Sequence, residues 1–367
     1  MDNRLIMNKL LTFAAVFVLA VSCSVHPRSL TLLIGTYTED ARPSDNRGVF
    51  LYSLDTKTLE AKQIGVAPSG NPSFVIQSPY GAYSVNEFND GRQGVSSYSF
   101  GEGGIALISQ ASIPQGGEDP CNILDTGGAI VTSNYTGGSI SAFAIEDDGR
   151  IGPLTQTWEP GLGDHAHIHC AALSPEGKYI FVADLGNDCI HRFLRQDGPA
   201  PLGESSIAWS NADTLKYGPR HFTFSPDGRF AYLLCELGDK LVCFSYEDGL
   251  LEPIQTLDAY DGGGHGSADI HLTPEGRFLY TSHRLKKDGV AIFAVDSASG
   301  QVDPVGYQPT GVHPRNFTVT PDGKLLLCAC RDSDRIEIYR IDPGSGLLKD
   351  SGKEIEVTSP VCVQVVR

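Results

Sequence analysis

The sequence predicts an all-β fold, a seven-bladed β-propeller, because one phrase recurs along the chain at nearly constant spacing. The phrase reads Ser-Pro-Asp-Gly-Arg-Phe-Ala-Tyr at 225–232. Related versions begin at Ser78, Asp125, Ser174, Thr273 and Thr320, so that successive phrases are 47, 49, 51, 48 and 47 residues apart. Short apolar strands and Pro/Gly turns at this period, without a helical pattern, are typical of propeller blades.

The length of the repeating region gives the number of blades. Residues 30–367 make up 338 residues, and division by the mean spacing of 242/5, about 48 residues, gives seven. Six phrases are present, so we expect the seventh blade to combine the apolar segments 30–37 and 360–366. Pairing of these terminal strands would close the ring and remove the exposed strand edges.

Composition agrees with a single globular domain at 30–367. The chain is 41% apolar and contains 41 Gly and 22 Pro, which suits a large core with many tight turns. Its formal net charge of −16 argues against nucleic-acid binding and against a broad basic surface for membranes. We expect a monomer.

Residues 1–29 predict a signal peptide and a short tether. Lys9 precedes an apolar run at 10–21 that is too short to span a bilayer. The run ends in Ala-Val-Ser-Cys at 20–23, which resembles the lipobox of bacterial lipoproteins, so a lipid on Cys23 would be the membrane anchor. We expect an exported protein, in the periplasm or anchored to a membrane. An ordinary cleaved signal is the alternative, and without a working signal the protein would be cytoplasmic.

Alignment of the repeats places charged residues at one end of the channel. The first two strands of a blade are antiparallel, so the start of the inner strand and the end of the next strand lie at the same mouth. The residues at the start are Ser73, Pro120, His169, Arg220, Ala268 and Arg315. The residues at the end are Tyr37, Glu87, Tyr135, Leu185, Glu236, Arg284 and Arg331. Desolvated charges need partners or a ligand, so the pattern predicts a functional site. A structural mouth whose charges face water is the alternative.

Eight phrases resemble the lactonase family of seven-bladed propellers, which includes 6-phosphogluconolactonases and the fungal carboxymuconate lactonizing enzyme. They are Gly35-Thr36-Tyr37-Thr38, Asn71-Pro72-Ser73-Phe74, Ser84-Val85-Asn86-Glu87, Ser133-Asn134-Tyr135, His167-Ile168-His169, Ala183-Asp184-Leu185-Gly186, Gly218-Pro219-Arg220-His221 and Pro314-Arg315-Asn316-Phe317. The resemblance implies a lactonase, a carboxylic ester hydrolase similar to 6-phosphogluconolactonase, acting on a small anionic lactone. It also implies that His169, Arg220, Glu236 and Arg284 lie in the active cleft. One departure is His283, where family members commonly have Asn.

These residue types suit the opening of a cyclic ester by water. His169, whose ordinary pKa lies near neutrality, is the candidate base, and Glu236 would orient or charge its ring. Arg220 and Arg284 would stabilise the oxyanion or hold a substrate carboxylate or phosphate. The predicted substrate-binding residues are Tyr37, Glu87, Tyr135, His167, His221, Arg315 and Arg331. We expect neither a cofactor nor a metal.

Three other interpretations stay open. Alternate residues of a strand point to the same face, so a metal could be held by His165, His167 and His169. A metal site usually needs a further ligand. A surface-anchored binding propeller would keep the fold without catalysis. A muconate cycloisomerase would also use an arginine-lined mouth.

Overall fold

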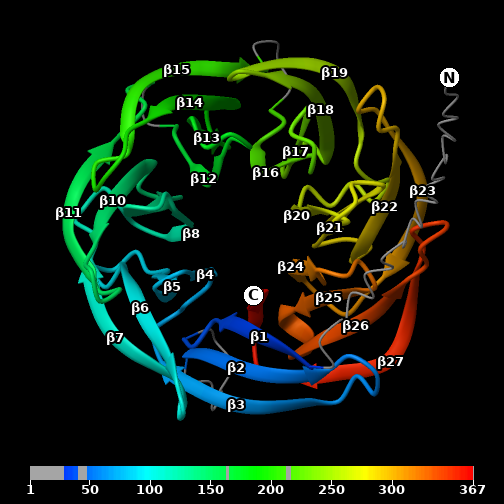
Figure 1. Ribbon diagram of the computed structural model, residues 1–367. Helices are drawn as coiled ribbons and strands as arrows, with labels where there is room; N and C mark the ends of the chain where they lie inside the picture. The colour runs from blue at the N-terminus through cyan, green and yellow to red at the C-terminus, as the bar shows by residue number, and fades with distance from the viewer. Residues whose placement is uncertain (1–28, 40–47, 163–164, 212–215, 367) are drawn as a thin grey trace, which may run out of the picture.

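The computed structural model describes residues 29–39, 48–162, 165–211 and 216–366. These residues form seven four-stranded antiparallel sheets arranged around a central channel (Figure 1). The predicted seven-bladed propeller is therefore confirmed. The predicted signal peptide and Cys23 lie outside the described residues.

Each blade runs from an inner strand beside the channel to an outer strand at the rim. The inner strands are β4 (Val75–Ser78), β8 (Pro120–Asp125), β12 (Ile168–Leu173), β16 (Pro219–Phe224), β20 (Ser267–Leu272), β24 (Pro314–Val319) and β28 (Pro360–Val366). The second strands are β5 (Gly81–Asn86), β9 (Ala129–Asn134), β13 (Tyr179–Asp184), β17 (Phe230–Cys235), β21 (Phe278–His283), β25 (Leu325–Cys330) and β1 (Ser29–Thr36).

The remaining strands complete the sheets in the same blade order. The third strands are β6 (Gly94–Gly101), β10 (Ser139–Ile145), β14 (Cys189–Arg195), β18 (Lys240–Glu247), β22 (Gly289–Val295), β26 (Arg335–Ile341) and β2 (Gly48–Asp55). The outer strands are β7 (Gly104–Ser112), β11 (Ile151–Trp158), β15 (Leu202–Ser210), β19 (Leu250–Asp258), β23 (Val302–Pro309), β27 (Leu348–Glu356) and β3 (Ala61–Pro68). A short 3-10 turn, η1 (Arg331–Ser333), follows β25.

The two ends of the chain close the ring in one sheet, as the sequence predicts. β28 pairs antiparallel with β1, with Leu33 opposite Gln364 and Ile34 opposite Val363. The resulting strand order is β28-β1-β2-β3 (Figure 1). Because β1 is hydrogen-bonded on both sides, neither of its edges is open to another chain.

The repeated phrase is the turn between the inner and second strands. Ser225 donates its hydroxyl to Asp227 Oδ1 at 2.7 Å and accepts the backbone N–H of Phe230 at 3.0 Å. Gly228 follows with φ of +70°, a left-handed conformation that glycine adopts without steric cost. Thr273 and Thr320 accept the equivalent backbone N–H groups, at 3.2 and 3.0 Å. The phrase therefore recurs because each blade needs the same reversal of chain direction between its inner and second strands.

Neighbouring blades are joined by apolar packing and by hydrogen bonds near the channel. Leu32 and Ile34 of β1 pack in one cluster with Leu327 and Ile338 of the adjoining blade. Polar residues near the starts of the inner strands accept backbone N–H groups from the next blade, in the pairs Asn122–Ala171 at 3.1 Å, Asp269–Phe317 at 3.1 Å and Asn316–Val363 at 2.8 Å. These hydrogen bonds tie neighbouring blades together at three junctions of the channel wall. In the part of the chain that the structure describes, we find no helical segment capable of spanning a bilayer.

Two equivalent tyrosines allow a test of how much one buried hydrogen bond stabilises this fold. Tyr280 is fully buried and donates its hydroxyl to the Gly346 carbonyl at 2.8 Å. Tyr232, 48 residues earlier in the chain and equally buried, has a hydroxyl without a partner among the described residues. We expect Tyr280→Phe to lower the free energy of unfolding by about 0.5–1.5 kcal/mol. The matched Tyr232→Phe should leave it unchanged or raise it, as measured by urea denaturation. Equal losses in both variants would contradict this account.

Candidate active site

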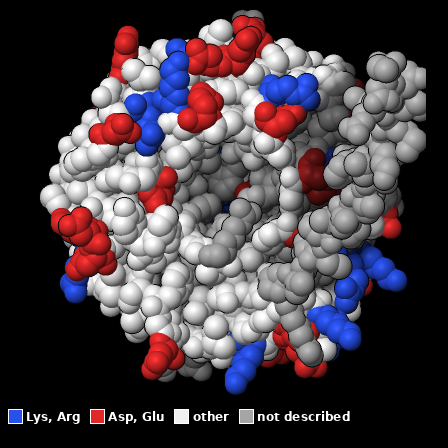
Figure 2. Space-filling view, viewed as in Figure 1, with Lys and Arg blue, Asp and Glu red and all other residues white. Residues whose placement is uncertain are grey.

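A cavity of about 350 Å³ lies at one mouth of the channel. Its walls combine acidic, basic and aromatic side chains. They are Glu87, Asp119, Cys121, Tyr135, Thr136, His169, Arg220, Glu236, Arg284 and Arg315. Figure 2 shows the ring from the same side as Figure 1, with a hollow at its centre and charges of both signs around the rim.

The seven residues at the ends of the second strands occupy equivalent places. Each donates its backbone N–H to a carbonyl shortly before or at the start of the adjacent inner strand. The donor–acceptor pairs are Tyr37–Ser359, Glu87–Asn71, Tyr135–Asp119, Leu185–His167, Glu236–Gly218, Arg284–Gly266 and Arg331–His313, at 2.7–3.1 Å. The structure therefore places these seven side chains at one mouth, at the same depth in each blade.

At the starts of the inner strands, the sequence alignment is wrong in one blade. Cys121, rather than Pro120, lines the cavity there. The reason is the turn after β8, where Thr126 donates its N–H to Ala129, so Thr126 takes the place that Ser174 has in the next blade. The phrase assigned to Asp125 is thus displaced by one residue. His169, Arg220 and Arg315 line the cavity as their positions predict.

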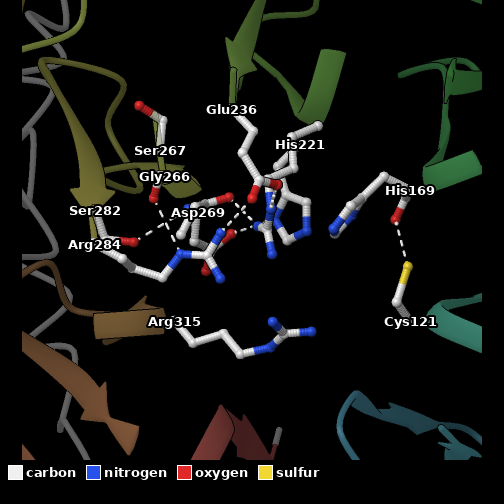
Figure 3. A network of polar contacts seen from close by, with 12 residues as sticks. Cys121, His169, His221, Glu236, Gly266, Ser267, Asp269, Ser282, Arg284 and Arg315 are labelled. Carbon is white, nitrogen blue, oxygen red and sulfur yellow. Dashed lines mark hydrogen bonds and ion pairs between the residues drawn. The ribbon is translucent and has the colours of Figure 1, made fainter. Parts of the chain in front are cut away.

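Glu236 joins two buried arginines from neighbouring blades (Figure 3). Its Oε2 accepts from Arg220 Nε and its Oε1 from Arg284 Nη2, both at 2.8 Å. Burial raises the pKa of Glu236, but the charges of Arg220 and Arg284 outweigh that effect and hold the pKa below its ordinary value. Glu236 was predicted to orient or charge His169. Its carboxylate joins the two guanidinium groups, and no hydrogen bond between Glu236 and His169 is found among the described residues.

The two arginines are held by further contacts from the same region. Arg220 Nη1 donates to the Ala268 carbonyl, and Arg284 Nε donates to the Gly266 carbonyl at 3.0 Å. Burial lowers the pKa of Arg284 to about 9, which still leaves it charged at neutral pH. Both guanidinium groups are therefore fixed cations with defined N–H directions.

A second charged group surrounds Tyr37. Its hydroxyl donates to Glu87 Oε1 at 2.7 Å, and Arg315 Nη2 lies 3.5 Å from Glu87 Oε2. The guanidinium carbons of Arg315 and Arg331 lie 5.4 and 5.5 Å from the centre of the Tyr37 ring. The ring of Tyr37 is thus already in contact with two cations, and it supports Glu87 and Arg315 rather than lining the cavity.

His169 is a buried imidazole beside the cations. Its Nδ1 has no hydrogen-bond partner among the described residues. Burial and the nearby positive charges, that of Arg220 foremost, hold the pKa of His169 well below its ordinary value. The ring is therefore neutral at neutral pH. The Tyr135 ring lies edge-on to it at 5.6 Å.

His167 contributes through Tyr135 instead of through the cavity. Its ring stacks on Tyr135 at 4.6 Å, and its Nδ1 lies 2.9 Å from the Tyr135 carbonyl oxygen. His165 is exposed in a turn before β12. The structure therefore does not bring His165, His167 and His169 together as metal ligands. Within the described ranges, the one group of possible ligand atoms close together is Asp184, Cys189 and His191, which excludes all three.

The structure separates the predicted site residues into two layers. Seven of them line the cavity, namely Glu87, Tyr135, His169, Arg220, Glu236, Arg284 and Arg315. The other four, Tyr37, His167, His221 and Arg331, lie behind these. The sequence analysis missed Asp119 and Thr136, which directly precede and follow recognised positions at Pro120 and Tyr135 and carried no signal of their own.

A larger cavity, about 760 Å³, is lined by residues including Tyr260, Tyr307 and Asp239. The two tyrosine hydroxyls donate to the backbone carbonyls of Lys286 and Lys287. Asp239 accepts the Ser267 hydroxyl at 2.8 Å. These side chains are engaged in holding the fold, so the candidate site is the smaller cavity, where guanidinium and imidazole groups converge.

Comparison with known proteins agrees with this architecture. The sequence model of the family described as "Lactonase, 7-bladed beta-propeller" matches residues 31–365. The chain is similar to the 6-phosphogluconolactonase of Formosa agariphila, with 32% identity over 91% of this chain and 99% of the relative. It is also similar to the 6-phosphogluconolactonase of Bacillus subtilis, with 30% identity over 90% of this chain and 97% of the relative.

Two solved structures share the whole propeller. A protein assigned as a 6-phosphogluconolactonase from Bacteroides uniformis superposes with a TM-score of 0.86 at 42% identity, covering 93% of this chain and 100% of the other. The periplasmic gluconolactonase of Pseudomonas aeruginosa superposes with a TM-score of 0.82 at 30% identity, covering 92% and 99%.

The ion pairs of Glu236 predict a large effect on stability. In Glu236→Gln two buried guanidinium groups lose their shared counter-ion, and we expect the free energy of unfolding to fall by about 3 kcal/mol or more. Asp148→Asn is the matched control, because its pair with Arg150 at 2.9 Å is exposed and should be worth less than about 1 kcal/mol. Urea denaturation measures both. A loss in Glu236→Gln no larger than in Asp148→Asn would show that the pairs do not hold the site together.

Buried or half-buried histidines predict a loss of stability in mild acid. Burial lowers the pKa of His221, His283 and His313 to about 4, 3 and 2. In the unfolded chain these rings take up protons near pH 6.5, so stability falls as the pH drops below about 6.5, by up to about 1.4 kcal/mol per pH unit for each ring. We expect the Tm to decrease between pH 7 and pH 5. His283→Asn should make the decrease shallower, and an unchanged slope would contradict the assignment.

Proposed function

The chain belongs to the lactonase family of seven-bladed β-propellers, and we propose that it hydrolyses a sugar lactone of the 6-phosphogluconolactone type in the cavity at the channel mouth. The names of the similar proteins from Formosa agariphila and Bacillus subtilis support this substrate class. The structure of the Pseudomonas aeruginosa gluconolactonase extends it to lactones without phosphate.

The observation that carries the proposal is the meeting of a neutral imidazole with three fixed guanidinium groups in one small cavity. His169, Arg220, Arg284 and Arg315 all line it. Glu236 occupies only part of the donor set of Arg220 and Arg284, since each contributes one N–H bond to it. Among the described residues, Arg220 donates through Nε to Glu236 and through Nη1 to Ala268, which leaves Nη2 without a hydrogen-bond acceptor. The cavity therefore offers donors to an anionic or developing negative oxygen.

Lactone opening needs a base for water and a cation for the carbonyl oxygen. His169 would take the proton of the attacking water, because its neutral ring is the form able to accept it. A guanidinium of Arg220 or Arg284 would stabilise the negative charge that forms on the carbonyl oxygen. Arg315, which lies below Arg284 in Figure 3 and also lines the cavity, would bind a phosphate or carboxylate of the substrate. We also propose that the protein is exported, for which the periplasmic relative is supporting evidence.

The activity is tested directly by lactone opening. Purified protein should open 6-phosphogluconolactone or gluconolactone faster than spontaneous hydrolysis. We expect His169→Gln to lower kcat by about 10²–10⁴-fold and Arg220→Gln to lower it by about 10²–10³-fold. Asp148→Asn should retain the wild-type rate, because the exposed Asp148 is not among the residues that line the cavity.

Other outcomes would point elsewhere. A wild-type rate equal to spontaneous hydrolysis for both lactones would overturn the proposal and favour a binding propeller or a cycloisomerase. Activity that a chelator removes would indicate a metal in the mechanism. A preference for the phosphorylated lactone that Arg315→Gln abolishes would assign Arg315 to the phosphate.

A further inference from the structure

Behind His169, a buried carboxylate lies in the channel wall. Asp269 is 2% exposed and comes from β20. Its Oδ1 lies 2.6 Å from His221 Nδ1, and its Oδ2 lies 2.9 Å from His271 Nε2. Oδ2 also accepts the Phe317 N–H at 3.1 Å. Burial raises the pKa of Asp269, but the two histidines outweigh that effect and lower it, so the carboxylate is ionised.

The ionised carboxylate determines which nitrogen of His221 carries the proton. A carboxylate can only accept hydrogen bonds, so the proton of the neutral His221 ring must be on Nδ1. His221 is neutral because burial and the charge of Arg220 lower its pKa to about 4. Its Nε2 therefore presents a lone pair. This atom is buried and has no hydrogen-bond partner among the described residues.

The neighbouring histidine carries a second buried ring nitrogen without a partner among the described residues. His169 Nδ1 is also buried without a described partner. The ring centres of His169 and His221 are 5.3 Å apart with an interplanar angle of 65°, and Figure 3 shows the two rings side by side. Two imidazoles joined by an N–H···N hydrogen bond have ring centres about 5 Å apart, given an N···N separation near 3 Å. A small rotation of either ring, or one bridging water, would join the two nitrogens.

We propose that Asp269 and His221 form a relay that fixes the tautomer of His169, with Nδ1 of His169 protonated toward His221 and Nε2 left bare toward the cavity. This inference rests on the proposed hydrolysis. Asp269 and His221 are positioning residues in it, and His169 is the catalytic residue. Without the relay, the proton of His169 could sit on Nε2 and leave no base in the cavity.

The hydrolytic step balances with this arrangement. An O–H bond of water breaks, its proton binds Nε2 of His169, and the water oxygen bonds to the lactone carbonyl carbon while the C=O π electrons move to the carbonyl oxygen. When the carbonyl re-forms, the ring C–O bond breaks and the leaving oxygen takes the proton back from Nε2. The Nδ1 proton of His169 stays directed at His221 throughout, and Asp269 remains ionised.

The tautomers can be measured without any substrate. Long-range ¹H–¹⁵N NMR of the ¹⁵N-labelled protein at pH 7 should show both His169 and His221 protonated at Nδ1 and bare at Nε2. In His221→Phe, which keeps a ring of similar size, His169 should lose its preference for the Nδ1 tautomer. A wild-type His169 protonated at Nε2, or one unaffected by His221→Phe, would overturn the relay.

Kinetic measurements provide a second test of the relay. We expect His221→Phe and Asp269→Asn to lower kcat for the active lactone by about 10²-fold or more with KM changed by less than about threefold. His271→Gln is the matched control, because it removes the other imidazole from the same carboxylate, outside the relay. A loss in His271→Gln equal to that in Asp269→Asn would show a structural role only. If Asp269→Asn does not fold, His221→Phe decides the question.

Different results would refute the proposed hydrolysis and the proposed relay. Wild-type protein that opens no lactone would refute the proposed function. Active wild-type protein whose His221→Phe and Asp269→Asn variants keep full kcat would refute the relay alone.

Discussion

The hydrogen bond between the end of each second strand and the start of the adjacent inner strand is the constraint on which the site depends. It occurs in all seven blades, from Tyr37–Ser359 to Arg331–His313. Because this bond fixes two side chains per blade at one mouth, the chemistry of the cavity is determined by the residue types at those positions. The Glu236 carboxylate reaches Arg220 in its own blade and Arg284 in the next for this reason.

The charges at this mouth explain how an acidic protein holds a cluster of buried cations. The chain has a formal net charge of −16, yet Arg220 and Arg284 are 2% and 5% exposed. Removing a guanidinium from water is costly unless a nearby anion and hydrogen-bond acceptors replace the water. Glu236 and the carbonyls of Ala268 and Gly266 do so. The arrangement has a stability cost that packing elsewhere must offset, which is typical of functional sites.

The repeat period, the closure of the ring by the terminal strands and most of the residues of the cavity wall could be predicted from the sequence, because the same local turn recurs in each blade. The error at Pro120 arose where the turn is anchored by Thr126, a change in loop length that the phrase does not reveal. The pairing of Glu236 with both Arg220 and Arg284 was not predicted, because only the three-dimensional placement shows which side chains its two oxygens reach. The role of Asp269 was not predicted, because its contact with His221 joins residues 48 positions apart in neighbouring blades.

The position of His169 between cations and a distant anion has a consequence for catalysis. In the resting site a protonated imidazole beside Arg220 is unfavourable, so the ring stays neutral and able to accept a proton. During attack by water, a positive ring and a negative carbonyl oxygen would form together. The guanidinium groups repel the positive imidazole ring but attract the negative carbonyl oxygen. They therefore disfavour the ring and the oxygen formed together less than they disfavour the positive ring alone. The proposed relay through His221 to Asp269 would add a compensating negative charge on the far side of the ring. In the proposed mechanism the site would therefore stabilise the charges that develop in the transition state more than those of the resting state, which is the condition for rate acceleration.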